Sequence, residues 1–463
     1  MSQPPQALPS SFRDPHSGYV FREGGTLFRR VERGAQTNYD SLMSSGLYEE
    51  LVADGLLVGH EEVQRSSMAD EAYKILRPEE IPFVSYPYEW CFSQLKDAAL
   101  ATLEIQKRAM AKGLSLRDAS SYNMQFNEGR FVLIDTLSFE PRPEGRPWVA
   151  YRQFCQHFLA PLALMSYRDI RLNQLLRVYI DGIPLDLAAN LLPAKAHARL
   201  PLQLHIFSHA KAQLKGGDAR GEERRTVTVS DRALTGIVES LAKGVENLDL
   251  ALSGSTWSDY YEKAAHYSSE AFEGKKEIVG GFIGEIAPGR LWDLGANVGL
   301  FSRIASQKGV FTIAWELDPG CVERNYRRAK EEGSTNLLPL ILDLANPSPG
   351  MGWANAERDE LASRGPTDAV MALALIHHLA IGNNVPLPLV ASYFARLGRH
   401  LIIEFVPKDD PKVQELLTSR EDIFDDYSIE GFEAAFGEHF EILRREELPG
   451  SSRVLYLMAS RPA

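Results

Sequence analysis

One short run constrains this chain more than any other: a glycine turn that joins an apolar strand to an amphipathic helix. The strand ends at Leu294, the turn runs from Gly295 to Gly299, and a helical apolar face follows. Glycine lets the backbone leave a strand at angles that other residues resist, and it allows a helix and a ligand to approach closely. Free N–H groups at the start of the helix suit a polar ligand. The run therefore predicts a loop that binds a nucleotide cofactor.

Polar side chains follow the later strands of the same region. A second apolar strand ends in Glu316, a third ends in Asp343, and a fourth is followed by His377 and His378. A carboxylate at the end of the second strand can accept hydrogen bonds from both hydroxyls of a ribose. These strand ends indicate a site for a nucleoside cofactor.

Asp293, Gly295, Gly299, Glu316 and Asp343 together resemble the first three motifs of class I S-adenosylmethionine-dependent methyltransferases. The resemblance covers residues 255–463 and includes two closing segments that are similar to the family's antiparallel hairpin. It implies an α/β fold with a Rossmann-like seven-stranded sheet, and S-adenosylmethionine as the cofactor.

The resemblance also implies a role for each motif residue. Gly295 and Gly299 would lie against the methionine part of the cofactor, and Asp293 would lie near its ammonium group. Glu316 would hold the ribose, and Asp343 would accept a hydrogen bond from the adenine amine.

Asn297 stands where many members of the family have a glycine. Asparagine tolerates left-handed backbone angles, so this departure does not change the expected cofactor. The rival interpretation is a nicotinamide dehydrogenase, whose fingerprint is Gly-x-Gly-x-x-Gly. This turn lacks that fingerprint, and we favour a methyltransferase.

Methyl transfer requires an acceptor that is correctly placed and, where it is acidic, a base to remove its proton. An imidazole titrates near neutral pH, which makes His377 and His378 the candidate catalytic residues. The alternative is that one histidine binds a loop carbonyl while the other packs. No Asp-Pro-Pro-Tyr or Asn-Pro-Pro-Tyr run follows the fourth strand, which argues against methylation of nucleic-acid amino groups. We expect an O- or N-directed enzyme with a small-molecule, sugar-derived or peptide acceptor.

A methyltransferase core needs fewer than half of the 463 residues, so at least two domains are expected. We predict an N-terminal α+β domain over 1–210, a linker and helical connection over 211–254, and the methyltransferase domain over 255–463. Residues 211–225 are glycine-rich and charged, which favours a flexible segment. The aromatic run Trp257 to Tyr267 either covers the cofactor or packs on a helix face.

The N-terminal half contains a second set of motif residues. Asp118, Asn123 and Asp135 occur in an order similar to that of protein kinases and aminoglycoside phosphotransferases. In those folds one carboxylate orients the attacking hydroxyl, while the amide and the second carboxylate hold magnesium. The glycine-rich loop and the phosphate-binding lysine are missing, with only Arg29 and Arg30 near the lysine's place.

Three interpretations of this half stay open: an active phosphotransferase, a degenerate kinase-like module that presents a substrate or partner, or a hairpin that mimics the pattern. The whole chain could accordingly be a methyltransferase whose N-terminal domain governs acceptor choice, a bifunctional phosphotransferase and methyltransferase, or a non-catalytic scaffold. The order of the two motif sets is similar to that of bacterial modification proteins, among them rhizobial nodulation proteins described as methyltransferases. That resemblance implies an acceptor derived from a sugar.

The composition indicates which partners and which cellular compartment to expect. The chain has 44% hydrophobic and 24% charged residues and no apolar stretch long enough to cross a membrane. A formal net charge of -12 disfavours nucleic acid and anionic membranes as partners. Three cysteines and the absence of a secretion signal indicate the cytoplasm. His205 and His209 have metal-binding spacing, but no third ligand lies nearby in the sequence, so no metal is expected.

Overall fold

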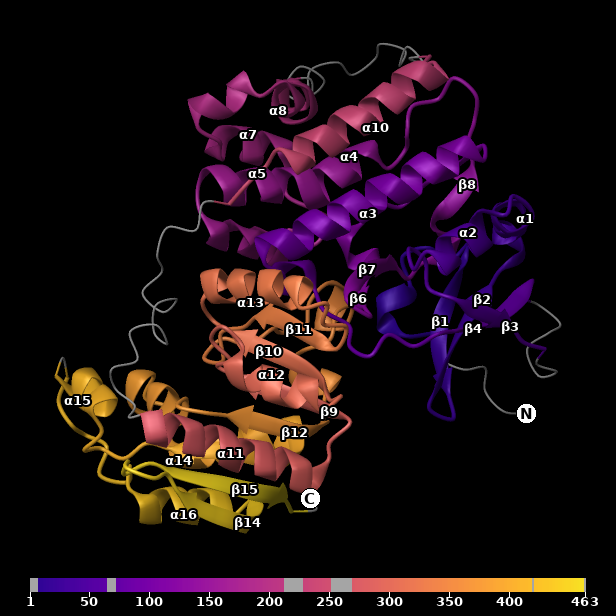
Figure 1. Cartoon of the computed structure of the whole chain (residues 1–463). Helices are drawn as coiled ribbons and strands as arrows, with labels where there is room; N and C mark the ends of the chain where they lie inside the picture. The colour runs from indigo at the N-terminus through magenta and orange to yellow at the C-terminus, as the bar shows by residue number, and fades with distance from the viewer. Residues whose placement is uncertain (1–6, 65–71, 212–227, 251–268, 419, 462–463) are drawn as a thin grey trace. The chain divides into compact units, whose positions relative to one another are not determined.

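The computed structural model describes residues 7–64, 72–211, 228–250, 269–418 and 420–461 (Figure 1). The chain forms two compact units. Unit 1 comprises Met1–Ala251 together with Met351–Arg358, and unit 2 comprises Leu252–Gly350 and Asp359–Ala463. The segment 212–225, predicted to be flexible, and the aromatic run Trp257 to Tyr267 lie outside the described residues.

Unit 2 is built on one seven-stranded sheet in the order β11-β10-β9-β12-β13-β15-β14. Its five parallel strands are β9 (Arg290–Leu294), β10 (Phe311–Glu316), β11 (Leu337–Ile341), β12 (Thr367–Ala372) and β13 (Gly398–Phe405). An antiparallel pair, β14 (Phe440–Glu447) and β15 (Val454–Ser460), closes the sheet next to β13. The predicted Rossmann-like methyltransferase sheet and its closing hairpin are confirmed.

This strand order determines where a ligand can bind. The chain adds β10 and β11 on one side of β9, and then β12 and β13 on its other side. In open parallel sheets, the crevice at such a reversal, beyond the carboxyl ends of the strands, is the usual ligand site. The loops that follow β9, β10, β11 and β12 therefore converge on one place.

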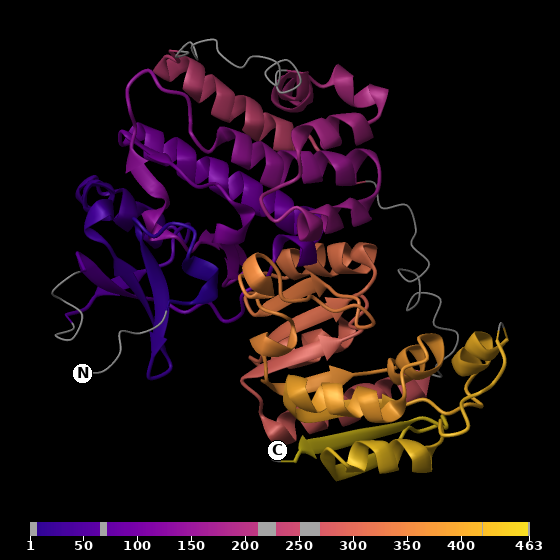
Figure 2. The same ribbon diagram turned by 180° about the vertical axis from the view of Figure 1, so that it is seen from behind.

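Helices cover both faces of the sheet (Figures 1 and 2). α11 (Ser269–Ile286) and α12 (Leu300–Gln307) bury Phe282, Ile283 and Phe301 in one cluster with apolar residues of β9, β12, β13 and β15. Among the described residues of unit 2, the other α-helices are α13 (Pro319–Glu331), α14 (Leu387–Leu397), α15 (Pro411–Leu417) and α16 (Ile429–Gly437). α13 packs on β10 and β11, and α14 packs on β12 and β13.

Unit 1 begins with a four-stranded antiparallel sheet in the order β1-β2-β4-β3. β1 (Gly18–Glu23) and β2 (Thr26–Val31) form a hairpin, and Gly24 and Gly25 supply the positive φ angles that a two-residue hairpin turn requires. β4 (Lys74–Pro78) and β3 (His60–Glu62) complete the sheet, and α1 (Gln36–Ser44) and α2 (Leu47–Ala53) precede β3 in the chain.

The rest of unit 1 is mainly helical. The long helix α3 (Phe92–Ala111) packs against α10 (Asp231–Glu246), which lies in the predicted linker and helical connection and is part of unit 1. Two short strand pairs lie between α3 and the later helices: β5 (Leu114–Leu116) with β8 (Phe139–Pro141), and β6 (Met124–Asn127) with β7 (Arg130–Leu133). Within the described ranges, none of the helices is both long and apolar enough to span a bilayer.

A buried ionic network connects α11 to the sheet in unit 2. Glu404 on β13 is fully buried and accepts hydrogen bonds from Lys275 at 2.6 Å and from Arg453 at 3.3 Å. Arg453 also binds Asp410 at 2.7 Å. Burial by itself would raise the pKa of Glu404, but the charges of Lys275 and Arg453 outweigh it and lower that pKa. The network therefore holds a carboxylate inside the unit.

We expect Glu404→Gln to destabilise unit 2 by about 3–5 kcal/mol, because the change removes the buried carboxylate that pairs with Lys275 and one of the two that pair with Arg453. Hydrogen exchange of β13 and β15 under increasing urea measures this loss. Glu273→Gln, which removes an exposed partner of Lys276, is the matched control and should leave the exchange unchanged. Equal protection in the two variants would contradict the stabilising role of the network.

Candidate functional site

The turn after β9 has the backbone conformation that its sequence predicts. Gly295, Asn297 and Gly299 have φ angles of 77°, 51° and 75°. A Cβ atom on Gly299 would overlap the side-chain amide of Asn325 on α13, so this glycine is required for helix packing. A Cβ atom on Gly295 would lie 3.2 Å from Leu375. The two glycines thus have different tasks, and only Gly295 lines the cavity described below.

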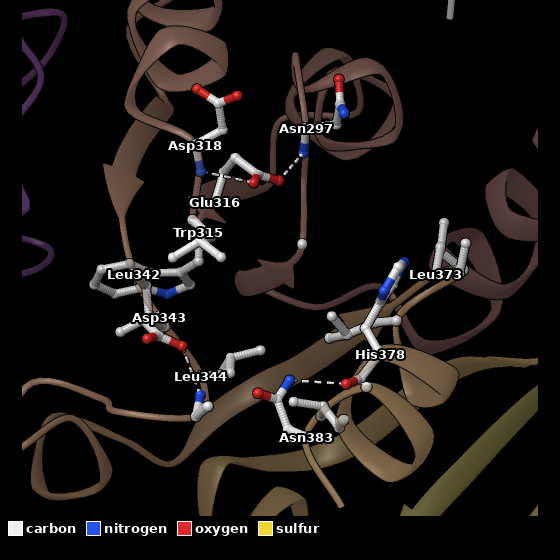
Figure 3. Close-up of a pocket in the computed structure, with 17 residues that line it drawn as sticks. Asn297, Trp315, Glu316, Asp318, Leu342, Asp343, Leu344, Leu373, His378 and Asn383 are labelled. Atoms are coloured by element: carbon white, nitrogen blue, oxygen red, sulfur yellow. Dashed lines mark hydrogen bonds between the residues drawn. The ribbon is translucent and has the colours of Figure 1, made fainter. Parts of the chain in front are cut away.

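Glu316, at the end of β10, connects two loops. Its Oε2 accepts the N–H of Asn297 at 2.8 Å, and its Oε1 accepts the N–H of Asp318 at 2.9 Å (Figure 3). Burial raises the pKa of Glu316, while these backbone hydrogen bonds act in the opposite direction. The side chain is therefore held in one orientation by backbone N–H groups of both loops.

A cavity of about 270 Å³ lies beyond the carboxyl ends of the strands. Polar groups of Asn297, Glu316, Asp343 and His378 face it together with apolar side chains (Figure 3). Its lining comprises positions 295, 297, 315–318, 342–345, 373–375, 378, 379, 382 and 383. The predicted strand ends thus meet at one site, as the reversal of strand order requires.

Asp343 follows β11 on the far side of this cavity from the β9 turn. Its Oδ1 accepts the N–H of Ala345 at 2.9 Å, which fixes the loop. Leu342, Leu344 and Leu373 supply apolar surface around it. A carboxylate beside apolar side chains can bind a flat heterocycle through one edge while the faces of the ring are covered.

Asp293 lies two residues before Gly295, which lines the cavity, but Asp293 itself does not line it. Its side chain is buried and accepts a 2.5 Å hydrogen bond from Ser302. Burial raises the pKa of Asp293 to about 7. This carboxyl group is therefore poised to change its charge near neutral pH.

The two candidate histidines differ in their surroundings. His378 lines the cavity, whereas His377 is 2% exposed and does not. Burial lowers the pKa of both, so each imidazole is neutral at neutral pH. Of the two, His378 is the one that reaches the cavity.

Some features of the cavity were not predicted from the sequence. Residues His378–Gly382 form a π-helical turn, and Asn383 donates to the backbone oxygen of His378 at 2.8 Å. Such turns are common at functional sites. The apolar walls could have been found from strand position alone, because Leu342 and Leu373 directly follow β11 and β12.

The kinase-like residues of unit 1 lie on the elements that the resemblance implies. Asp118 follows β5, and Asn123 and Asp135 flank the β6–β7 hairpin. Asn123 and Ile134 share a backbone hydrogen bond of 2.9 Å, which brings the two ends of the hairpin together. The pairing of β5 with β8 completes the arrangement.

The contacts of these residues are structural ones. Asp135 pairs with Arg29 of β2 at 2.7 Å and also accepts hydrogen bonds from Leu137 and Ser138. Asp118 accepts hydrogen bonds from Ser120 and Gln153. A guanidinium group thus contacts the carboxylate whose place in the sequence resembles that of the magnesium-binding aspartate of kinases.

Comparison with known proteins gives one full-length relative. The chain is 34% identical over 464 residues to nodulation protein NoeA of Rhizobium meliloti (strain 1021), covering 98% of this chain and 96% of NoeA. The chain belongs to the NoeA family. No family model matches this NoeA-family chain.

Solved structures resemble less than half of the NoeA-family chain. The bifunctional kinase-methyltransferase WbdD is 15% identical, with 43% of this chain and 41% of WbdD covered and a TM-score of 0.30. The PH0226 protein of Pyrococcus horikoshii OT3 is 17% identical, with 44% and 99% covered and a TM-score of 0.32. Magnesium protoporphyrin IX methyltransferase (ChlM) of Synechocystis PCC 6803 with bound SAH is 17% identical, with 45% and 95% covered and a TM-score of 0.32.

The raised pKa of Asp293 predicts that unit 2 loses stability as the pH rises. The folded carboxyl keeps its proton up to about pH 7, whereas an unfolded aspartate releases it near pH 4. Asp293→Asn cannot ionise, so its free energy of unfolding relative to wild type should increase between pH 4 and 7, by at most about 1.4 kcal/mol per pH unit.

Urea unfolding at pH 5, 6 and 8 measures this difference. Asp425→Asn is the matched control, because Asp425 is exposed and its substitution should leave the pH profile of the wild type intact. If the difference in unfolding free energy between Asp293→Asn and wild type did not change with pH, the raised pKa of Asp293 would be wrong.

Proposed function

We propose that this chain is an S-adenosylmethionine-dependent methyltransferase, acting on oxygen or nitrogen of a small-molecule, sugar-derived or peptide acceptor. The observation that carries the proposal is the position of Glu316. Its carboxylate holds the β9 turn through Asn297 and faces a cavity that also contains Asp343. Two carboxylates at neighbouring strand ends, with apolar surface around one of them, fit a nucleoside.

The cavity residues fit the parts of the cofactor. Glu316 would accept hydrogen bonds from the ribose hydroxyls, and Asp343 would accept one from the adenine amine between apolar walls. Gly295, which lines the cavity without a side chain, would lie against the methionine part. When bound, the cofactor supplies an electrophilic methyl group on a sulfonium centre.

The protein's own task is then to orient the acceptor and to manage its proton. His378 has a neutral imidazole in the cavity lining and is our candidate base. The net charge of -12 supports an acceptor other than nucleic acid. Unit 1 would contribute acceptor selection as a degenerate kinase-like module.

We infer a cytoplasmic location for this activity. Cys91, Cys155 and Cys321 are all buried, and none of the three forms a disulfide. Cysteines outside disulfides are typical of proteins in a reducing compartment.

Calorimetric titration with S-adenosylmethionine tests the cofactor. We expect wild type to bind and Glu316→Ala to bind at least tenfold more weakly, because hydrogen bonds to a charged group contribute about 1.5–3 kcal/mol each. Glu316→Gln, which keeps the side chain's length, should give an intermediate affinity. Glu438→Ala removes an exposed glutamate and is the control. No heat with wild type, or equal affinity in all variants, would disprove the proposal.

Transfer of radioactive methyl from the cofactor to fractions of small molecules, saccharides and peptides identifies the acceptor. With that acceptor, His378→Asn should keep its cofactor affinity within twofold and lose about 10²–10⁴-fold in turnover. Because the pKa of His378 is lowered, the wild-type rate should decline only in acid, below the usual range for histidine. His16→Asn, at an exposed position, is the control. Full turnover in His378→Asn would exclude this residue as the base.

A further inference from the structure

Trp353 is the one fully described tryptophan that faces solvent. It is 77% exposed, whereas Trp90, Trp148, Trp292 and Trp315 are all buried within the described parts of the chain. Trp353 belongs to the segment Met351–Arg358, which is part of unit 1. An indole that has been left in water needs an explanation, because its burial is strongly favourable.

The turn that carries Trp353 is held in a costly conformation. Gly352, Ala354 and Asn355 have φ angles of 76°, 55° and 57°. Each non-glycine residue in this region costs about 1–3 kcal/mol and persists only where its surroundings impose it. Here the turn is closed by mutual backbone hydrogen bonds of 3.0 Å between Met351 and Arg358. The exposed indole is therefore rigidly presented.

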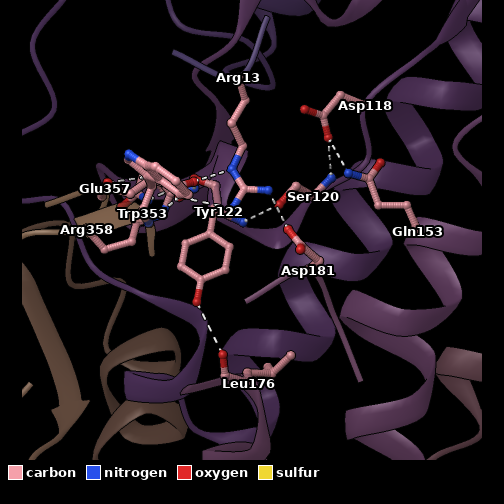
Figure 4. Close-up of polar contacts among 11 residues, drawn as sticks. Arg13, Asp118, Ser120, Tyr122, Gln153, Leu176, Asp181, Trp353, Glu357 and Arg358 are labelled. Atoms are coloured by element: carbon pink, nitrogen blue, oxygen red, sulfur yellow. Dashed lines mark hydrogen bonds and ion pairs between the residues drawn. The ribbon is translucent and has the colours of Figure 1, made fainter. Parts of the chain in front are cut away.

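A buried carboxylate joins this turn to an arginine. Glu357 has a fully buried side chain that accepts the N–H of Trp353 at 3.2 Å and both Nε and a terminal nitrogen of Arg13 at 2.5 and 3.0 Å (Figure 4). Asp181 binds the other terminal nitrogen of Arg13 at 2.7 Å. The guanidinium retains two N–H donors beyond these three bonds. Arg13 is half-exposed and Asp181 is mostly exposed.

Arg13 and Trp353 line a shallow hollow of about 610 Å³ together with Phe12, Ile180 and Gly352. Aromatic surface in its lining lies beside the fixed donor Arg13, and the exposed acceptor Asp181 is bonded to that arginine. A pyranose ring matches this combination, because its C–H face is apolar while its hydroxyls both donate and accept at the edge. A nucleic acid or phosphate group would be repelled by Asp181, and a protein interface usually excludes charged groups from its centre.

We propose that this hollow is a saccharide-binding site, with Trp353 stacking on a sugar ring and Arg13 and Asp181 bonding its hydroxyls. The site lies next to the kinase-like loop of the same unit. Arg358 closes the turn and stacks on Tyr122 at 4.5 Å, and Tyr122 directly precedes Asn123 (Figure 4). The inference does not depend on methyl transfer, because saccharide binding is measured without a cofactor.

The test is calorimetry of the full chain with tetrasaccharides of glucose, mannose, galactose and N-acetylglucosamine. We expect at least one to bind, Trp353→Ala to lose at least tenfold in affinity, and Trp353→Phe to retain most of it. Asp181→Asn, which removes the charge but keeps an acceptor, should weaken binding less than Trp353→Ala. Leu200→Ala, at another exposed apolar position of unit 1, is the control and should bind like wild type.

Failure of all four saccharides to bind wild type would overturn the proposal, as would equal affinity in wild type and Trp353→Ala. Sedimentation velocity on the same proteins examines the alternative occupant, a second copy of this chain. Self-association that Trp353→Ala abolishes, with no saccharide binding, would assign the hollow to a protein interface. Trp353→Ala should bind S-adenosylmethionine with the same affinity as wild type. A failure of the saccharide test therefore does not affect the methyltransferase proposal, and a failure of the cofactor test does not affect the saccharide proposal.

Discussion

The candidate cofactor site depends on one carboxylate that accepts two backbone N–H groups. Glu316 binds Asn297 in the loop after β9 and Asp318 in the loop after β10. Asn297 is in the left-handed region, and its N–H points at Glu316 only because the turn is held in that conformation. The glycine turn and the acidic residue at the end of β10 thus form one structural unit. Either feature alone would be weak evidence for a cofactor site, and their contact explains why they occur together.

Much of unit 2 was predictable because parallel strands are buried on both faces and read as short apolar runs. The apolar runs that end at Leu294, at Glu316 and before Asp343 are all strands in the structure, and polar residues at their ends lie at one edge of the sheet. The strand pairs of unit 1 were harder to predict from the sequence. Its short strand pairs, such as β5 with β8, are held by contacts between residues distant in sequence, and local pattern contains little information about such pairing.

The roles of individual site residues were harder to predict, because burial is a property of the fold. His377 and His378 are adjacent in sequence, but only His378 faces the cavity. Gly295 and Gly299 look equivalent in the motif, but Gly299 is required by Asn325 of α13. Lys275 and Glu404 are far apart in the chain and meet at 2.6 Å in the interior. Only the packing of α11 on the sheet brings them together.

In the kinase-like half, Asp135 lies directly after the β6–β7 hairpin and pairs with Arg29 of β2 at 2.7 Å. An arginine holds its carboxylate partner in fixed hydrogen-bond geometry, so this pair ties the end of the hairpin to the N-terminal sheet. The start of the hairpin is tied to a different segment, because Arg358 stacks on Tyr122, the residue before Asn123. The hairpin therefore links the Arg29 pair to the turn that presents Trp353.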